Sequence, residues 1–123
     1  MRAITLSPDP RSAGAARAFV RSVIEGHVAD TDDAVLLTSE LVSNVIRHAH
    51  TDVTVEVEVG PPVRVGVRDG AAATGAFRAL MERPTWPETS SVTGRGLSLL
   101  RALSSSFGLD DDESGGKVVW FEL

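Results

Sequence analysis

Three polar residues spaced four apart, Glu40, Asn44 and His48, are the first candidates for chemistry in this sequence. In a helix this spacing places the side chains on one face, one turn apart. An amide oxygen suits Mg²⁺ as a hard ligand, a carboxylate can orient or deprotonate a nucleophile, and the histidine can contact a phosphate or form an ordinary hydrogen bond. The stripe borders an apolar face, so it is also typical of the solvated flank of an amphipathic helix. The residues alone leave both interpretations open.

Two segments with glycine are the next candidates. Asp69-Gly70 follows a strand pattern, where a carboxylate can accept a hydrogen bond from the exocyclic amine of a purine and glycine lets a base approach the backbone. Gly94-Arg95-Gly96-Leu97 opens a predicted helix, whose free N–H groups can bind phosphate. Taken singly, each segment is also typical of a plain turn or of the end of a loop.

Several common sites do not fit. A P-loop needs Lys and Ser or Thr after its second glycine, but Ala76-Phe77 follows Gly75. Leu99 stands where the dinucleotide fingerprint needs its third glycine. The histidines lack the spacing of a zinc site, no cysteine assists them, and no Gly-x-Ser-x-Gly motif supports a nucleophilic serine.

The elements that would position these residues interleave helices and strands. Predicted helices cover residues 13–25, 30–48, 76–82 and 97–103, and predicted strands cover 2–6, 53–59, 63–68, 104–109 and 117–123. Valines alternate with polar residues in the second and third strands, which indicates a sheet with one buried face. We therefore expect an α/β (α+β) fold, a two-layer sandwich of a mixed, mostly antiparallel sheet with helices on one face.

Composition narrows the class of protein. A chain of 123 residues suits one domain, and it has no run of about 20 apolar residues that could cross a membrane. The net charge of −5 argues against general nucleic-acid binding, which needs a basic surface. The absence of cysteine excludes disulfides and favours a cytoplasmic location.

The order of the motifs adds a resemblance. The chain resembles the bacterial anti-sigma-factor serine kinases, members of the ATPase superfamily shared by gyrase, Hsp90, histidine kinases and MutL. The resemblance covers about residues 10–123 and rests on segments 39–49, 65–70, 94–97 and 116–121. It implies one ATPase-like domain over residues 1–123 that binds ATP with Mg²⁺.

The resemblance also implies roles for the candidate residues. Glu40 would be the general base, Asn44 the Mg²⁺ ligand, and His48 a further contact of the nucleotide. Asp69-Gly70 would meet adenine, and Gly94-Arg95-Gly96-Leu97 would frame the phosphates.

Beyond the site, the resemblance implies a lid at about residues 71–93, a segment that also has the least regular sequence pattern. Its implied partners are a sigma factor and an antagonist protein that is phosphorylated on Ser or Thr. A homodimer is expected, without direct nucleic-acid or membrane contact.

Three positions depart from the family pattern. Ala71-Ala72-Ala73 stands where Ser-Pro or glycine is common, Ser91-Val92-Thr93 supplies no basic residue, and Lys117-Val118 supplies no hydroxyl. A second hypothesis is therefore a non-catalytic module that binds partners with or without nucleotide. A third is a detached histidine-kinase catalytic domain, although no phosphoacceptor helix precedes the motifs.

Overall fold

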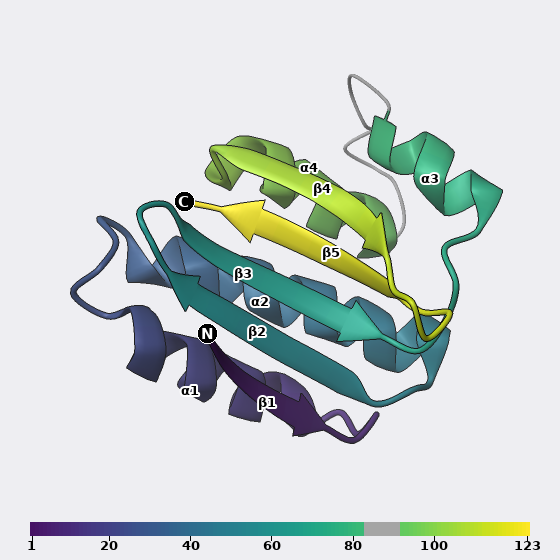
Figure 1. Cartoon of the computed structure of the whole chain (residues 1–123), viewed down its shortest axis with the longest axis horizontal. Helices are drawn as coiled ribbons and strands as arrows, with labels where there is room; N and C mark the ends of the chain where they lie inside the picture. Colours follow the sequence, from purple (N-terminus) through teal and green to yellow (C-terminus); the bar gives the residue numbers. More distant parts are fainter. Residues whose placement is uncertain (83–91) are drawn as a thin grey trace.

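Five strands in the described part of the computed structural model, residues 1–82 and 92–123, form one sheet (Figure 1). They are β1 (Arg2–Leu6), β2 (Val53–Val59), β3 (Val63–Asp69), β4 (Ser106–Asp111) and β5 (Lys117–Glu122). Their order across the sheet is β1-β2-β3-β5-β4, and each neighbouring pair is antiparallel. The sheet is therefore antiparallel throughout and not mixed. Short turns join β2 to β3 and β4 to β5, and such hairpins require antiparallel partners.

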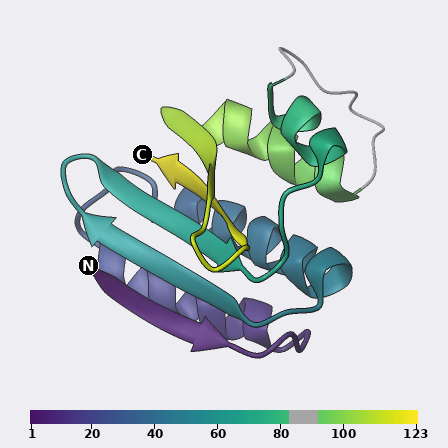
Figure 2. The same ribbon diagram turned by 45° about the vertical axis from the view of Figure 1, so that its right-hand side comes forward.

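Helices cover one face of this sheet, as expected (Figures 1 and 2). Within the described residues they are α1 (Ser12–Ile24), α2 (Thr31–Asn44) and α4 (Val92–Leu103), and a π-helical turn, η1 (Val45–Ala49), continues α2. A further helix, α3 (Gly75–Glu82), stands beside α4 and is tied by an ion pair to the end of β4. None of the helices described is long and apolar enough to cross a membrane.

The helix α4 begins earlier than its sequence suggests. The pattern predicts a helix from Leu97 after a glycine turn, whereas α4 already begins at Val92. The Gly94-Arg95-Gly96 segment therefore lies inside the first turns of the helix. Each glycine costs a helix only about 1 kcal/mol relative to alanine. The full burial of Leu97 and Leu100 outweighs that cost.

Alternation along the strands builds the core. Six helix-facing valines of β2 and β3 are at most 5% exposed, at positions 53, 55, 57, 63, 65 and 67, whereas Val59 at the end of β2 is 39% exposed. Opposite them in register, β5 adds Val119 and Phe121. The other sheet face is open to solvent and polar, with Arg68 Nε donating to Glu56 Oε1 at 2.7 Å.

The end of α2 departs from a regular α-helix. The helix starts as predicted, with Asp30 accepting a hydrogen bond from the backbone N–H of Asp33 at 3.1 Å. The sequence predicts one continuous helix to about His48, but the turn widens at Val45 into η1. The N–H of His50 reaches the carbonyl oxygen of Val45 at 3.1 Å, and His50 adopts the left-handed φ of 56°. Such π turns occur frequently at functional sites.

The conformation of His50 predicts how substitutions there affect stability. We expect His50→Gly to raise the free energy of unfolding by up to about 1 kcal/mol, because glycine adopts a positive φ without a Cβ clash. His50→Val should lower it by about 1–2 kcal/mol. Urea unfolding monitored by circular dichroism measures both variants, and a valine variant as stable as the glycine variant would contradict the left-handed conformation.

Candidate functional site

A cavity of about 230 Å³ lies where α2 and η1 face the end of β3, the start of β5 and α3. Most of its wall is apolar, and the polar residues that line it are Asn44, His48, Asp69, Thr74 and Lys117. The structure thus brings together four residues that the sequence singled out, from three separate motifs: Asn44, His48, Asp69 and Leu97. The fold therefore brings residues of all three motifs to one cavity.

Asn44 has an unsatisfied polar atom in this site. Its Oδ1 is buried and has no hydrogen-bond partner, a state shared in the described residues only by Trp120 Nε1 on the open face of the sheet. A buried acceptor left without a donor costs about 1–3 kcal/mol. Orphaned groups of this kind are rare and call for a ligand, an ion or a water.

A close approach of α2 and α4 surrounds the same amide. Gly96 is buried, and a Cβ built on it would lie 3.0 Å from Asn44 Nδ2 and 3.7 Å from Glu40 Cβ. A larger residue at position 96 would displace the amide of Asn44. The predicted glycine motif therefore meets the predicted polar stripe directly, and Glu40 lies one turn before Asn44, half-buried beside α4.

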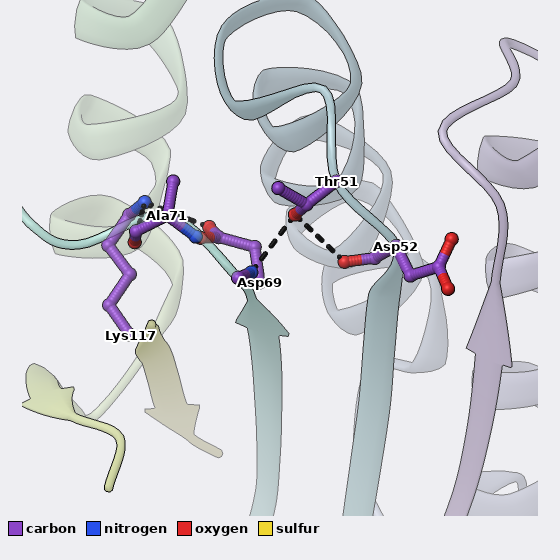
Figure 3. Close-up of polar contacts among 6 residues, drawn as sticks. Thr51, Asp52, Asp69, Ala71 and Lys117 are labelled. Atoms are coloured by element: carbon purple, nitrogen blue, oxygen red, sulfur yellow. Dashed lines mark hydrogen bonds and ion pairs between the residues drawn. The ribbon is translucent and has the colours of Figure 1, made fainter. Parts of the chain in front are cut away.

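Asp69 is a buried carboxylate at the end of β3, with a side chain 3% exposed. Its Oδ1 accepts hydrogen bonds from the backbone N–H of Ala71 at 2.8 Å and from Lys117 Nζ at 3.0 Å. Lys117 Nζ also lies 2.9 Å from Oδ2 and donates to the carbonyl oxygen of Ala71 at 3.1 Å (Figure 3). The charge of the carboxylate is therefore balanced by one ammonium group inside the cavity wall.

Backbone contacts on both sides hold Asp69 in place. Thr51 Oγ1 accepts a hydrogen bond from the N–H of Gly70 at 2.9 Å and donates to the carbonyl oxygen of Asp52 at 3.0 Å (Figure 3). On the other side, a Cβ at Gly116 would lie 2.0 Å from the carbonyl oxygen of Asp69, so only glycine fits there. These contacts tie the end of β3 to the segment after η1 and to the start of β5.

The turn between β4 and β5 delivers Lys117 to the site. Asp112 closes the turn through its N–H, which donates to the carbonyl oxygen of Gly116 at 2.9 Å. A hydrogen bond from the hydroxyl of Ser114 lowers the pKa of Asp112. The guanidinium of Arg68, 2.8 Å from the carboxylate, lowers this pKa further. The turn is thus anchored to β3 one residue before Asp69.

The other predicted site residues lie around the cavity or outside the described part. Gly70 follows Asp69, and its N–H is bonded to Thr51. Gly94-Arg95 lies in the first turn of α4, and the phosphate contact expected of the Arg95 side chain falls outside what the structure describes. Of the predicted lid at 71–93, residues 71–82 are described and include α3, while 83–91 lie outside the described residues.

Lys117 and Thr51 are site residues that the motif search missed. The sequence did contain a signal for Lys117. Every second residue of β5 faces the helices, which places Lys117 on the same face as Val119 and Phe121. The same alternation in β3 places Asp69 on the face of Val67. Strand pairing then sets Lys117 opposite Asp69. Thr51 gave no comparable signal, since its role depends on the widened turn before it.

The oxygen atoms around the cavity fit a magnesium ion that takes most of its ligands from water and phosphate. Among the described residues no three His, Asp or Glu side chains gather as a metal cluster. Mg²⁺ typically keeps several waters and takes one or two protein oxygens together with substrate phosphates. The orphaned Oδ1 of Asn44 is one hard oxygen of the right kind.

Comparison with known proteins agrees with the observed fold. The profile of the histidine kinase-like ATPase domain matches residues 6–123. No curated protein sequence gives a match, whereas 10 solved chains do. One of these is the crystal structure of the RsbU and RsbW domains of Rv1364c from Mycobacterium tuberculosis, 19% identical with a TM-score of 0.62.

That match covers 99% of this chain and 32% of the mycobacterial chain, so the present chain spans about a third of its length. At this identity the likeness shows a shared fold. The profile match, in contrast, extends over almost the whole sequence. The protein therefore belongs to the histidine kinase-like ATPase domain family.

Proposed function

We propose that this protein is an ATP-binding regulatory domain that resembles anti-sigma factors with serine/threonine kinase activity. The observation that carries the proposal is the buried, unpartnered Oδ1 of Asn44 in a cavity that also contains the buried carboxylate of Asp69. Asn44 would supply an oxygen for the metal and Asp69 a carboxylate for the base, both in one largely apolar pocket, and these are two recognition elements that Mg-ATP needs.

The adenine base would lie inside the cavity, and the phosphates would extend out of it. A volume of about 230 Å³ is below the range of roughly 300–1,000 Å³ for pockets that enclose a whole drug-sized ligand, so it suits a flat heterocycle. Apolar residues such as Val67, Phe77 and Leu97 would contact its faces. Asp69 would accept a hydrogen bond from the exocyclic amine of adenine, with Gly70 leaving room beside it.

The phosphate end would lie at the contact of α2 and α4. Asn44 would hold Mg²⁺, which supplies charge neutralisation for the phosphates when it is bound. Gly94 would offer its backbone N–H group in the first turn of α4, Arg95, Gly96 and Leu97 would frame the phosphates beside it, and His48 would contact the nucleotide from η1.

Glu40 would then accept the proton of a Ser or Thr hydroxyl of an antagonist protein. The hydroxyl oxygen bonds to the γ-phosphorus, and the bond from that phosphorus to the oxygen of ADP breaks. A sigma factor would be the second partner. The protein would form a homodimer in the cytoplasm and would contact neither nucleic acid nor membrane. The mycobacterial chain, which contains RsbU and RsbW domains together, supports a regulatory setting.

The alternative function is a non-catalytic module that binds partners with little or no nucleotide. The ion pair of Asp69 with Lys117 favours it, since the carboxylate already has a charged partner. The two functions differ in what Asn44 does. If the protein is a kinase, loss of the Asn44 side chain would abolish phosphate transfer. If it is a non-catalytic module, the same loss would leave partner binding intact.

Asn44→Ala provides the first test of ATP binding. We expect wild-type protein to bind ATP saturably in isothermal calorimetry, and more tightly with Mg²⁺ than without it. The variant should weaken Mg-ATP binding by about tenfold or more, equivalent to about 1.4 kcal/mol, and lose most of the effect of Mg²⁺. Asp69→Asn should weaken ATP binding with and without the metal, because it acts on the base.

Leu36→Ala is the matched control, since Leu36 lies on α2 but is 38% exposed. It should bind Mg-ATP like the wild type. No binding of ATP by the wild type up to millimolar concentration would reject the ATP site and leave the partner-binding module.

Glu40→Gln tests the transfer step separately. With γ-labelled ATP and an extract of the source cells, wild-type protein should label a Ser or Thr of a partner. The variant should lower that labelling by about 10²–10⁴-fold, the usual contribution of a general base, and keep its affinity for Mg-ATP. Equal labelling by both proteins would exclude Glu40 as the base.

A further inference from the structure

We propose that Lys117 and Asp69 together read the edge of the purine ring, so that the site accepts 6-oxo purines as well as 6-amino purines. This inference rests on the nucleotide binding proposed above and concerns its base specificity. A lone carboxylate offers a base only hydrogen-bond acceptors. An ammonium beside it adds a donor at the same place.

The two groups form one unit at the cavity wall. Lys117 Nζ lies within 3.0 Å of both carboxylate oxygens of Asp69, and both residues line the cavity. Their side chains are 13% and 3% exposed. Figure 3 shows the ammonium bridging the carboxylate and the backbone of Ala71. A base that approaches Asp69 therefore meets the ammonium as well.

The hydrogen-bond inventory leaves one acceptor and one donor for a ligand. Each carboxylate oxygen has two lone pairs. The N–H of Ala71 and the ammonium occupy Oδ1, whereas only the ammonium meets Oδ2. The ammonium has three N–H groups, of which one serves Ala71 and one can be shared by both oxygens of Asp69. One N–H of Lys117 and one lone pair of Asp69 Oδ2 then remain for a ligand.

This pair matches either kind of purine. Adenine presents its 6-amino donor beside the acceptor N1, and hypoxanthine or guanine presents the acceptor O6 beside the donor N1–H. With adenine, Asp69 would accept from the 6-amino group and Lys117 would donate to N1. With a 6-oxo purine the two partners exchange places, so the base would lie turned over, with Asp69 accepting from N1–H and Lys117 donating to O6. Without the ammonium, O6 would face a carboxylate with no donor.

The apolar surroundings make this recognition effective. The ring of Phe77 lies 5.7 Å from Lys117 Nζ, and Val67 and Val119 line the cavity nearby. Placing O6 against such a wall without a hydrogen-bond donor costs free energy. A missing partner for a charged group changes affinity by about tenfold to a hundredfold.

The first experiment compares nucleotides on the unaltered protein. Calorimetric titrations with Mg-ATP and with the magnesium complex of inosine triphosphate, which has O6 but no 2-amino group, should give dissociation constants within about tenfold of each other. Binding of ATP with inosine triphosphate weaker by more than about a hundredfold would overturn this inference and leave the ATP site intact. Failure of both nucleotides to bind would overturn the ATP site, and this inference with it.

Two variants identify the ammonium as the cause. Lys117→Met should raise the preference for ATP over inosine triphosphate by about tenfold or more, because it removes the donor to O6. Lys117→Arg keeps a cationic donor and should keep the wild-type preference. An unchanged preference in a folded methionine variant would mean that Lys117 only neutralises Asp69, and would overturn the inference.

A spectroscopic measurement covers the case in which the methionine variant does not fold. Lys117 is the only lysine in the chain, so isotopic labelling of lysine reports on this ammonium alone. Both nucleotides should shift its nuclear magnetic resonance signal at saturation. A signal that stays in place with either bound nucleotide would contradict direct contact with the base.

Discussion

The burial of Asp69 at the end of an apolar strand is the constraint on which the rest of the site depends. The core-facing series of β3 runs through three valines and then reaches a carboxylate instead of a fourth apolar residue. A carboxylate in such a place is costly unless it is paired and hydrogen-bonded. The pairing comes from Lys117, and the N–H of Ala71 adds a hydrogen bond from the turn that follows. The strand pair β3–β5 therefore fixes both the core and the chemistry at its end.

Two glycines allow close backbone approaches around the cavity. Gly116 lets the start of β5 touch the carbonyl oxygen of Asp69, and Gly96 lets α4 approach Asn44 on α2. The first contact lies at the end of β3 and the second where α2 meets α4. Since α2 and the sheet share one core, both contacts are tied to the same packed layers.

Much of this could be predicted from the sequence because the signals are local. Alternating valines predicted β2 and β3. The three polar residues spaced by four predicted the stripe that supplies Asn44 from α2 and His48 from η1 to the cavity. The boundary of α4 was missed because glycine tolerance in a helix depends on packing elsewhere in the chain. The π turn at Val45 was missed because it keeps the same apolar pattern as an α-helix. Lys117 was missed because its partner lies 48 residues away and depends on register.

The ion pair itself argues that this end of the cavity does more than stabilise the fold. Replacing a buried ion pair by well-packed apolar residues of similar volume is often neutral or stabilising. The preceding core-facing pair on the same two strands, Val67 and Val119, shows that valine is accepted there. Stability alone therefore does not explain why Asp69 and Lys117 form the next such pair. The pair lies at the cavity wall and not deep between the layers, which is where a ligand can meet it. Removal of both charges would then leave the fold intact, whereas removal of one would leave the other buried and unpaired.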